Sequence, residues 1–435
     1  MKPFITLILP SLNVYPYIEK CLESVEKQTF FSEMEVLLID AGSTDGTLEC
    51  LEDFEKRYDN VTLIMSGEKS YGYQVNLGIR RAQGEYVAIL ETDDYVRENM
   101  YELLYEKAKE HDLDFAKADY SRFSTLRSGF EMHEPVMAFS GDEAKYDKVL
   151  DPTFLDEAYK TDYLIWRGIY KTSFLRDNDI YLRETRGAAF QDIGFAMKVL
   201  SCADRAMYVK DILYCYRTDR PSASMNSGRA IYYSKDEFES LLKEWGGRLP
   251  YIKGIYLYML QAFVGDITFL SKGYELFDAE VQPSYYMLKE RIDKALKTGI
   301  ICREDVSNWE YDCYKRISAD LYSYLDQLAI KEGTRKELAD KCRARSEGKN
   351  IIFGTGNYGK KCLNFLDHQD VDVDGFIDNS AGKDAEFANL PIMNPAEIKD
   401  LNDTTFIIAS KNGAEDMRNQ LEQMGVAPSD ILIWF

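Results

Sequence analysis

Histidine is scarce in this sequence, with three residues in 435, and none has a partner at metal-ligand spacing. We therefore expect His111, His133 and His368 to play no part in metal binding. The eight cysteines form no CxxC pair, which indicates reduced thiols rather than a disulfide framework. No run of about 18 apolar residues occurs, so we expect no membrane-spanning helix.

Positive charge is also in short supply. Lys and Arg number 53 against 74 Asp and Glu, which leaves a net charge of −21. This balance argues against a duplex nucleic-acid partner, because binding to phosphates needs a basic surface. No signal-peptide pattern precedes the strand-like run Phe4–Leu9. We expect a cytoplasmic protein, and peripheral contact with the inner face of a membrane stays open.

The chain is long enough for two or three domains at about 150 residues each. Apolar residues make up 45% of it, which allows a sizeable core. The 31 tyrosines suit binding to sugar faces and interfaces, and they equally suit ordinary core and surface positions.

Residues 1–228 begin with alternating strand and helix patterns. The expected strands are Phe4–Leu9, Glu35–Ile39, Val61–Met65, Glu85–Leu90 and Asp114–Ala118. Helical patterns separate them, which predicts an α/β domain with a doubly wound, mostly parallel sheet.

Two further regions follow. Residues 229–348 have a helical pattern without a recognisable motif, and we expect them to present an acceptor, bridge domains or mediate self-association. Residues 349–435 return to strands and helices, which predicts a small Rossmann-like α/β module.

Polar residues follow three strands of the first domain. In an open α/β sheet, ligands bind beyond the carboxyl ends of the strands, so these residues are candidates for one shared site. The candidate residues, with side-chain or backbone groups at these strand ends, are Pro10, Leu12 and Asn13 after the first strand, Asp40, Gly42 and Ser43 after the second, and Glu91, Asp93 and Asp94 after the fourth.

The three acids at 91–94 repel one another unless a positive group lies among them. Mg²⁺ or Mn²⁺ held by carboxylate oxygens and substrate phosphates would supply it. The alternative is a solvated acidic turn before the next helix.

The combination resembles glycosyltransferase family 2, which has the GT-A fold. The resemblance covers residues 3–225 and is carried by FITLILPSLNVYPYIEKCLESVEKQTF, VLLIDAGSTDGT and YGYQVNLGIRRAQGEYVAILETDDY. It implies an inverting transfer from a nucleotide-sugar donor, with a UDP-sugar favoured, to a glycan, glycolipid or protein acceptor.

The resemblance also implies roles for residues. Asp40 would bind the nucleobase, and backbone at Pro10 and Leu12 would line the base and ribose. Asp93 and Asp94 would bind the metal, with Glu91 near the ribose or diphosphate. The other implied donor-site residues are Asn13, Gly42, Ser43 and Asn76. Ala41 and Glu91 stand where the family usually has Asp, which leaves donor identity open.

Inverting transfer needs a carboxylate to take the acceptor proton. In GAAFQDIGFAMKVL, Asp192 stands where the family carries its base, and Gln191 precedes it. The alternative is that Asp192 only caps a helix.

Further polar candidates are less specific. Arg217 and Arg220, with Ser222 and Ser224, suit a diphosphate leaving group, and the alternative is a basic surface loop. Trp166 and Arg167 either face the acceptor or are buried for structural reasons.

The last module carries Gly354, Gly356 and Gly359 in a GxGxxG pattern, with Asp378 at ribose-binding distance along the chain. It resembles the nucleotide-binding N-terminal lobes of some sugar-modifying enzymes. Nucleotide binding and a vestigial or assembly role both stay open.

The predicted function is therefore metal-dependent glycosyl transfer in the synthesis of a cell-surface polysaccharide, glycolipid or glycoprotein. One alternative is a nucleotide-sugar-modifying, oxidoreductase-like protein acting through the GxGxxG module. Another is a non-catalytic protein that binds nucleotide-sugars.

Overall fold

The computed structural model describes residues 3–150, 162–221, 228–246, 252–270, 273–344, 348–398 and 401–435. They group into two compact units. Unit 1 is Met1–Arg122 with Glu134–Leu321, and unit 2 is Phe123–His133 with Tyr322–Phe435. The predicted domain boundaries after 228 and 348 stay predictions.

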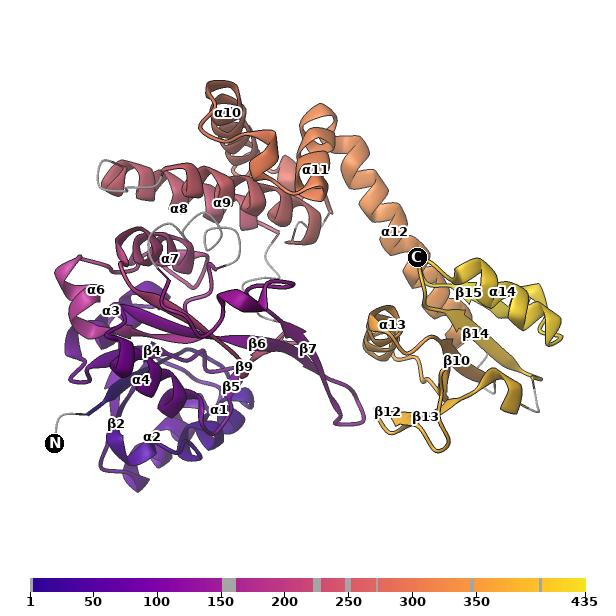
Figure 1. Ribbon diagram of the computed structural model, residues 1–435, viewed down its shortest axis with the longest axis horizontal. Coiled ribbons are helices and arrows are strands. Elements are labelled where there is room, and N and C mark those ends of the chain that lie inside the picture. Colours follow the sequence, from indigo (N-terminus) through magenta and orange to yellow (C-terminus); the bar gives the residue numbers. More distant parts are fainter. Residues whose placement is uncertain are drawn as a thin grey trace. The chain divides into compact units, whose positions relative to one another are not determined.

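Among the described residues, unit 1 contains most of a nine-stranded sheet with the order β3-β2-β1-β4-β8-β6-β9-β5 and with β7 beside β6 (Figure 1). Its strands are β1 (Ile5–Ser11), β2 (Met34–Asp40), β3 (Val61–Met65), β4 (Tyr86–Ile89), β5 (Tyr95–Val96), β6 (Phe115–Thr125), β7 (Glu131–Val136), β8 (Gly168–Lys171) and β9 (Ala206–Arg217).

The four strands from β3 to β4 are parallel. Their continuous apolar sequences fit this position, since a parallel strand is covered on both faces. From β8 onward the pairing is antiparallel, as between β4 and β8 and between β6 and β8. The strand expected at 114–118 is therefore a longer, antiparallel one.

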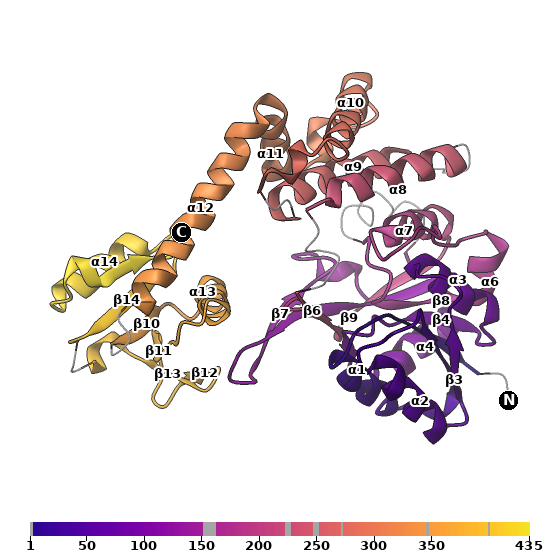
Figure 2. The ribbon, with the colours of Figure 1, turned by 180° about the vertical axis from the view of Figure 1, so that it is seen from behind.

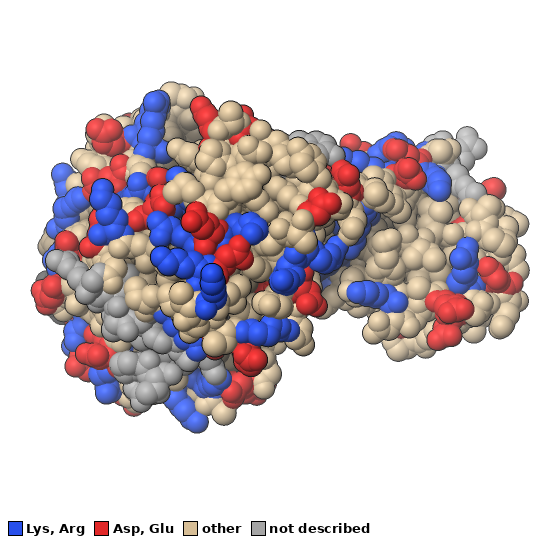
Figure 3. Space-filling model, turned by 90° about the horizontal axis from the view of Figure 1, so that it is seen from above, with Lys and Arg blue, Asp and Glu red and all other residues tan. Residues whose placement is uncertain are grey.

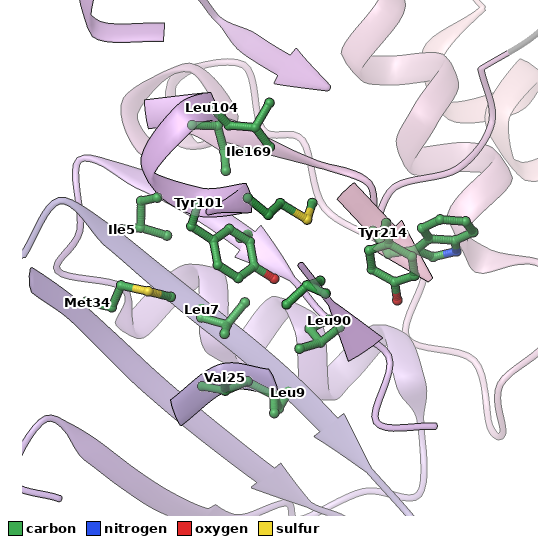
Figure 4. Packing of buried hydrophobic residues seen from close by; sticks show 14 of the residues in the cluster. Ile5, Leu7, Leu9, Val25, Met34, Leu90, Tyr101, Leu104, Ile169 and Tyr214 are labelled. Carbon is green, nitrogen blue, oxygen red and sulfur yellow. The ribbon is translucent and has the colours of Figure 1, made fainter. Parts of the chain in front are cut away.

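Helices cover both faces of the parallel half. On one face, Ile5, Leu7 and Leu9 of β1 belong to the same buried cluster as residues of helices α1 and α4. The helix residues are Val25 of α1 and Tyr101 and Leu104 of α4 (Figure 4). On the other face, Ile8 meets α3 so closely that a Cβ on Gly78 would lie 2.6 Å from it. This two-sided cover confirms the doubly wound arrangement.

The helices of the first half of unit 1 are α1 (Tyr17–Glu26), α2 (Thr47–Arg57), α3 (Tyr71–Arg81), α4 (Met100–His111), α6 (Thr172–Asp177) and α7 (Gln191–Cys202). The predicted helical region follows with α8 (Ala230–Trp245), α9 (Ile252–Gly265), α10 (Gln282–Thr298) and α11 (Asn308–Ala319). Figures 1 and 2 show α7 lying between the sheet and α8. No helix in the described ranges has the length and apolar character to cross a membrane.

Unit 2 has a second sheet with the order β12-β13-β11-β10-β14-β15, in which only the β12–β13 pairing is antiparallel. Its elements are α12 (Leu321–Arg343), β10 (Lys349–Phe353), α13 (Asn357–His368), β11 (Gly375–Ile377), β12 (Glu386–Phe387), β13 (Leu390–Met393), β14 (Thr404–Ile408), α14 (Ala414–Gln423) and β15 (Ile431–Ile433). The prediction of a second α/β sheet is confirmed.

The tip of the β6–β7 hairpin belongs to unit 2. Leu126 is buried in its core cluster, and Phe130 and Met132 pack against the same cluster. Arg127 forms ion pairs with Asp367 and Asp372, at 3.3 and 3.0 Å. The sequence pattern did not predict this insertion, because the hairpin lies more than 200 residues away from its partners along the chain.

On the face shown in Figure 3, basic and acidic side chains of the described residues are interspersed with uncharged surface. This view therefore offers no reason to revise the expectation that nucleic acid is not a partner.

Candidate active site

The turn after β2 is built around Asp40. Its Oδ1 accepts hydrogen bonds from the backbone N–H groups of Gly42 and Ser43, both at 2.8 Å, and its Oδ2 accepts one from the Ser43 hydroxyl at 2.5 Å. Asp40 is fully buried. In this structure the carboxylate therefore holds the loop, and the predicted contact with a nucleobase stays a prediction.

The turn after β1 lies against this loop. Asn13 donates its backbone N–H to Ser43 Oγ at 2.9 Å and accepts from the Thr44 N–H at 2.9 Å. Pro10 is buried, and its carbonyl accepts from Thr92 Oγ1 at 3.0 Å; Leu12 is half-buried. The two strand ends and the acidic segment are thus joined, as the topology predicts.

Asp93 is the member of the acidic segment that faces a cation. Arg220 donates to its Oδ2 at 2.8 Å and to the Asn13 carbonyl at 3.0 Å. The side chains of Asp93 and Arg220 are 20% and 15% exposed to solvent, so the pair is reachable from the protein surface. An incoming anion or cation can therefore compete for this ion pair.

Asp94 has a different environment. It is 1% exposed, and its carboxylate accepts from the Tyr214 hydroxyl and from the Arg217 backbone N–H, both at 2.7 Å. Arg217 also donates to the Asp93 carbonyl at 3.0 Å and stacks over Tyr17. Asp94 and Arg217 thus fix the acidic segment to β9, and their predicted ligand contacts stay predictions.

Burial raises the pKa of two acids in this segment, Glu91 and Asp94. The pKa of Glu91 rises to about 8, and the charges of Asp93 and Asp192 add to the effect of burial. The Tyr71 hydroxyl donates to Glu91 and partly offsets this effect. The tyrosine stands at the first position of α3.

The loop before α7 brings a distant segment to the same place. Asn76 donates to the Leu182 carbonyl at 2.8 Å and accepts from the Leu182 N–H at 2.9 Å. The Tyr71 N–H donates to the Gly187 carbonyl at 3.0 Å. Asn76, predicted to bind the donor, is 1% exposed and in this structure anchors the loop to α3.

Asp192 lies in the first turn of α7, where its Oδ1 accepts from the Ile193 N–H at 3.1 Å. Burial raises its pKa to about 6. Tyr71 links the two segments, because its hydroxyl donates to Glu91 and its backbone N–H donates to Gly187 in the loop before Asp192. The charge of Asp192 also adds to the rise that burial causes in the pKa of Glu91 and of Tyr71. Gln191 is buried and donates to Thr185 Oγ1 at 2.8 Å, which orders the loop.

Trp166 and Arg167 are both buried, which agrees with the structural alternative. Trp166 stacks on Tyr214 and Tyr216, with ring centroids 4.2 and 5.1 Å apart. Arg167 pairs with Asp162 at 3.0 Å. Ser222 and Ser224 lie outside the described residues.

In unit 2, the GxGxxG loop connects β10 to α13, as predicted. A Cβ on Gly359 would lie 1.9 Å from the Gly354 carbonyl oxygen, whereas one on Gly356 would meet nothing within 4 Å. Asp378 accepts from the backbone and hydroxyl of both Thr355 and Ser380. Burial would raise its pKa, but these hydrogen bonds lower it to about 2. Nucleotide binding by this loop stays a prediction.

A metal ion would have to share this site with its substrate. Among the residues that the structure describes, no three His, Cys, Asp or Glu side chains are arranged as a metal-binding group. Mg²⁺ and Mn²⁺ commonly take one or two carboxylates and complete their shell with water and phosphate oxygens. Metal binding by Asp93 and Asp94 stays a prediction; of the two, Asp93 has the more exposed side chain, and Asp94 is buried.

Comparison with known proteins defines the class of the first domain. Residues 6–164 match the family described as Glycosyl transferase family 2, and residues 346–432 match the family described as C2185-like, N-terminal. Residues 6–164 are therefore similar to glycosyltransferase family 2, and the observed sheet confirms the predicted doubly wound α/β fold class. Asp192 lies beyond the matched segment.

Curated relatives have glycosyltransferase names. Glycosyltransferase GlyG of Streptococcus pneumoniae is 27% identical over 56% of this chain and 80% of its own length. The uncharacterized glycosyltransferase EpsJ of Bacillus subtilis is 28% identical over 58% and 70%. The poly(ribitol-phosphate) beta-N-acetylglucosaminyltransferase TarS of Staphylococcus aureus is 28% identical over 55% of this chain and 39% of TarS.

Two solved structures overlap loosely with this one. A crystal structure of S. aureus TarS 1–349 is 20% identical, with a TM-score of 0.41 over 68% of this chain and 92% of that one. The mannosyltransferase PcManGT from Pyrobaculum calidifontis, in complex with GDP-Man and Mn²⁺, is 15% identical, with a TM-score of 0.42 over 76% and 87%. Overlaps this loose identify no ligand for the present chain.

Sequence reasoning missed the tyrosines that hold the acids. Tyr71 binds Glu91, and Tyr214 binds Asp94. Tyr71 directly follows Ser70, whose hydroxyl caps α3 by accepting from the Tyr73 N–H at 3.1 Å. That cap was a signal that could have placed Tyr71 in the first helical turn. Tyr214 had no such signal, because only the β5–β9 pairing places it beside Asp94.

Proposed function

We propose that this protein is a metal-dependent, inverting glycosyltransferase that moves a sugar from a UDP-sugar to a hydroxyl of a glycan, glycolipid or protein. The observation that carries the proposal is the pair of hydrogen bonds made by Tyr71. Its hydroxyl donates to Glu91, which follows β4, and its backbone N–H donates at 3.0 Å to the carbonyl of Gly187 in the loop that leads to Asp192, in a chain whose residues 6–164 match glycosyltransferase family 2.

Asp192 is proposed as the general base. It takes the proton from the acceptor hydroxyl as that oxygen attacks the anomeric carbon. Its pKa of about 6 leaves it ionised at neutral pH yet basic enough to accept a proton. Glu91, protonated near neutral pH by its pKa of about 8, would not compete for this role.

The other proposed groups neutralise the negative charge of the leaving diphosphate. Asp93 would hold Mn²⁺ or Mg²⁺ together with diphosphate oxygens and water, and the ion would neutralise developing charge on the leaving group. Arg220 presents a guanidinium beside Asp93, and guanidinium groups form paired hydrogen bonds with phosphate oxygens. Exchange of Arg220 from Asp93 to the diphosphate would free the carboxylate for the cation.

The test is release of UDP with Mn²⁺ present, followed for UDP-N-acetylglucosamine, UDP-glucose and UDP-galactose with and without a poly(ribitol phosphate) acceptor. The first donor and the acceptor are chosen because the relative TarS is named for this transfer. We expect Asp192→Asn and Asp93→Asn each to lower turnover by about 100-fold or more.

Asp53→Asn is the matched control, since Asp53 is an exposed residue of α2 whose side chain is 77% exposed. It should release UDP at the wild-type rate. Wild-type turnover in Asp192→Asn would refute the assignment of the base, and turnover unaffected by EDTA would refute the proposed metal dependence.

A further inference from the structure

A buried acid on α8 faces the turn that carries Asp192. Glu237 is 2% exposed, and its Oε1 accepts from Arg183 at 3.0 Å. Its Oε2 has no hydrogen-bond partner among the described residues. A Cβ built on Gly194 would lie 3.0 Å from that Oε2, so the oxygen points at the first turns of α7.

A half-satisfied buried carboxylate is costly, so its position needs a reason. Asp192 and Gly194 lie two residues apart at the start of α7, and the cap residue Phe190 makes no side-chain cap. A negative charge near a helix N-terminus is favourable. The carboxylate of Glu237 therefore packs against the turn from which Asp192 projects, and when both acids are ionised it also repels Asp192.

The partner of Glu237 holds the preceding loop. Arg183 also pairs with Asp236 at 3.0 Å, so it is bound by two acids of α8. From the opposite side, a Cβ on Gly72 in α3 would lie 1.9 Å from the Arg183 carbonyl oxygen. The loop that leads to Asp192 is thus fixed between α3 and α8.

We propose that Glu237 and Arg183 are positioning residues for Asp192, through which the helical region controls the orientation and the charge of the base. The part about catalysis rests on the proposed function. The charge coupling does not, because it follows from the packing of α7 against α8 alone (Figure 1).

Titratable groups from several elements interact with Asp192 and Glu237. Burial raises the pKa of several neighbouring groups, and the charge of Asp192 adds to each rise. These groups include Tyr71 on α3, Tyr163, Tyr258 on α9 and Glu91. Burial raises the pKa of Glu237 to about 7; Arg183 opposes the rise, and Asp192 and Asp236 add to it. From α7, Lys198 also feels the charge of Glu237. Between pH 5 and pH 8, Glu237 and Asp192 both become ionised, so their repulsion appears only at the upper end.

The first experiment is a double-mutant cycle of Asp192→Asn and Glu237→Gln in the full chain, read as Tm at pH 5 and pH 8. At pH 8 either substitution relieves the same repulsion, which can be relieved only once. We therefore expect the Tm of the double variant to be clearly lower than the sum of the two single Tm changes predicts. At pH 5 the two effects should add. Additive effects at pH 8 would overturn the coupling, whatever the enzyme does.

The second experiment is the pH profile of kcat for UDP release, using the donor of the three above that wild type turns over fastest. Removing the positive charge in Arg183→Gln should move the acid limb, near pH 6, up by about 0.5 pH unit. Glu237, with a pKa of about 7, is mostly protonated at this limb, so Glu237→Gln should lower kcat and leave the limb in place. Structural damage alone in Arg183→Gln would lower kcat without moving the limb.

Glu239→Gln is the matched control, because Glu239 is on the same helix and pairs with Arg291 at 2.8 Å. It should leave the profile unchanged. An unshifted acid limb in Arg183→Gln, or wild-type kcat in Glu237→Gln, would overturn the positioning role. Full turnover by Asp192→Asn would instead overturn the proposed base, and the Tm cycle would then still decide the coupling.

Discussion

The buried ion cluster around Asp162 allows a sharp prediction for stability. Asp162 is fully buried and forms salt bridges with Lys117 at 2.8 Å and Arg167 at 3.0 Å, both 1% exposed. Burial would raise the pKa of Asp162, but the two cations outweigh it and hold the pKa below its usual value. We predict that Asp162→Asn leaves two buried cations without their main counter-charge.

Removal of one partner from a buried pair typically costs about 3 to 5 kcal/mol. Burial lowers the pKa of Lys117 to about 8, although the charge of Asp162 opposes this effect. Without Asp162 the pKa would fall further, so Lys117 would lose its proton and part of the lost stability would be recovered. We therefore expect a loss of about 3 kcal/mol, which corresponds to a fall in Tm of about 5 °C for a unit of about 310 residues.

The assay is urea unfolding at pH 7, followed by tryptophan fluorescence, with Asp53→Asn as an exposed control expected to change by less than about 0.5 kcal/mol. Adding Lys117→Met to Asp162→Asn should restore at least half of the stability, because it removes one orphaned cation. A loss below about 1 kcal/mol in Asp162→Asn would show that these charges are not held as described.

Three further predictions concern the loops and the base. Because a base works when deprotonated and the pKa of Asp192 is about 6, kcat should fall as the pH drops through about 6, and a flat profile from pH 5 to 8 would contradict this. Gly72→Ala forces a Cβ to 1.9 Å from the Arg183 carbonyl, so UDP release should fall at least about 10-fold while unit 2 keeps its unfolding transition. Gly359→Ala makes the same kind of clash with Gly354 and should destabilise unit 2 by about 1 to 3 kcal/mol in urea, whereas Gly356→Ala, with open space around its Cβ, should stay within about 1 kcal/mol of wild type.

The sequence predicted the parallel half of the first sheet well, because its strands are continuous apolar runs closed by polar turns. Val61–Met65 has the predicted bounds, and the run Phe4–Leu9 differs from Ile5–Ser11 only at its ends. The antiparallel half was mostly missed. Strands such as Gly168–Lys171 are short, and their pairing partners lie far away along the chain.

The candidate site divides in the same way. Asp93 and Asp192 were predicted from local motifs, and their roles stay predictions; the structure links the loop before Asp192 to Glu91 through Tyr71. Asp40 and Asn76 were predicted to bind the donor, yet both are buried in hydrogen bonds that hold loops. A motif shows that a residue type is needed at a position, but not whether its polar atoms face a ligand or the backbone.

The sequence by itself determined the α/β class, the acidic segment after the fourth strand and the helical character of the middle region, because these depend on local periodicity and on residue types close together in the chain. Only the tertiary structure decided that α8 places Glu237 against α7 and that the tip of the β6–β7 hairpin enters unit 2. Such contacts form between segments that are far apart along the chain. The sequence pattern of either segment does not show them, because periodicity indicates which face of an element is buried but not which other element covers it.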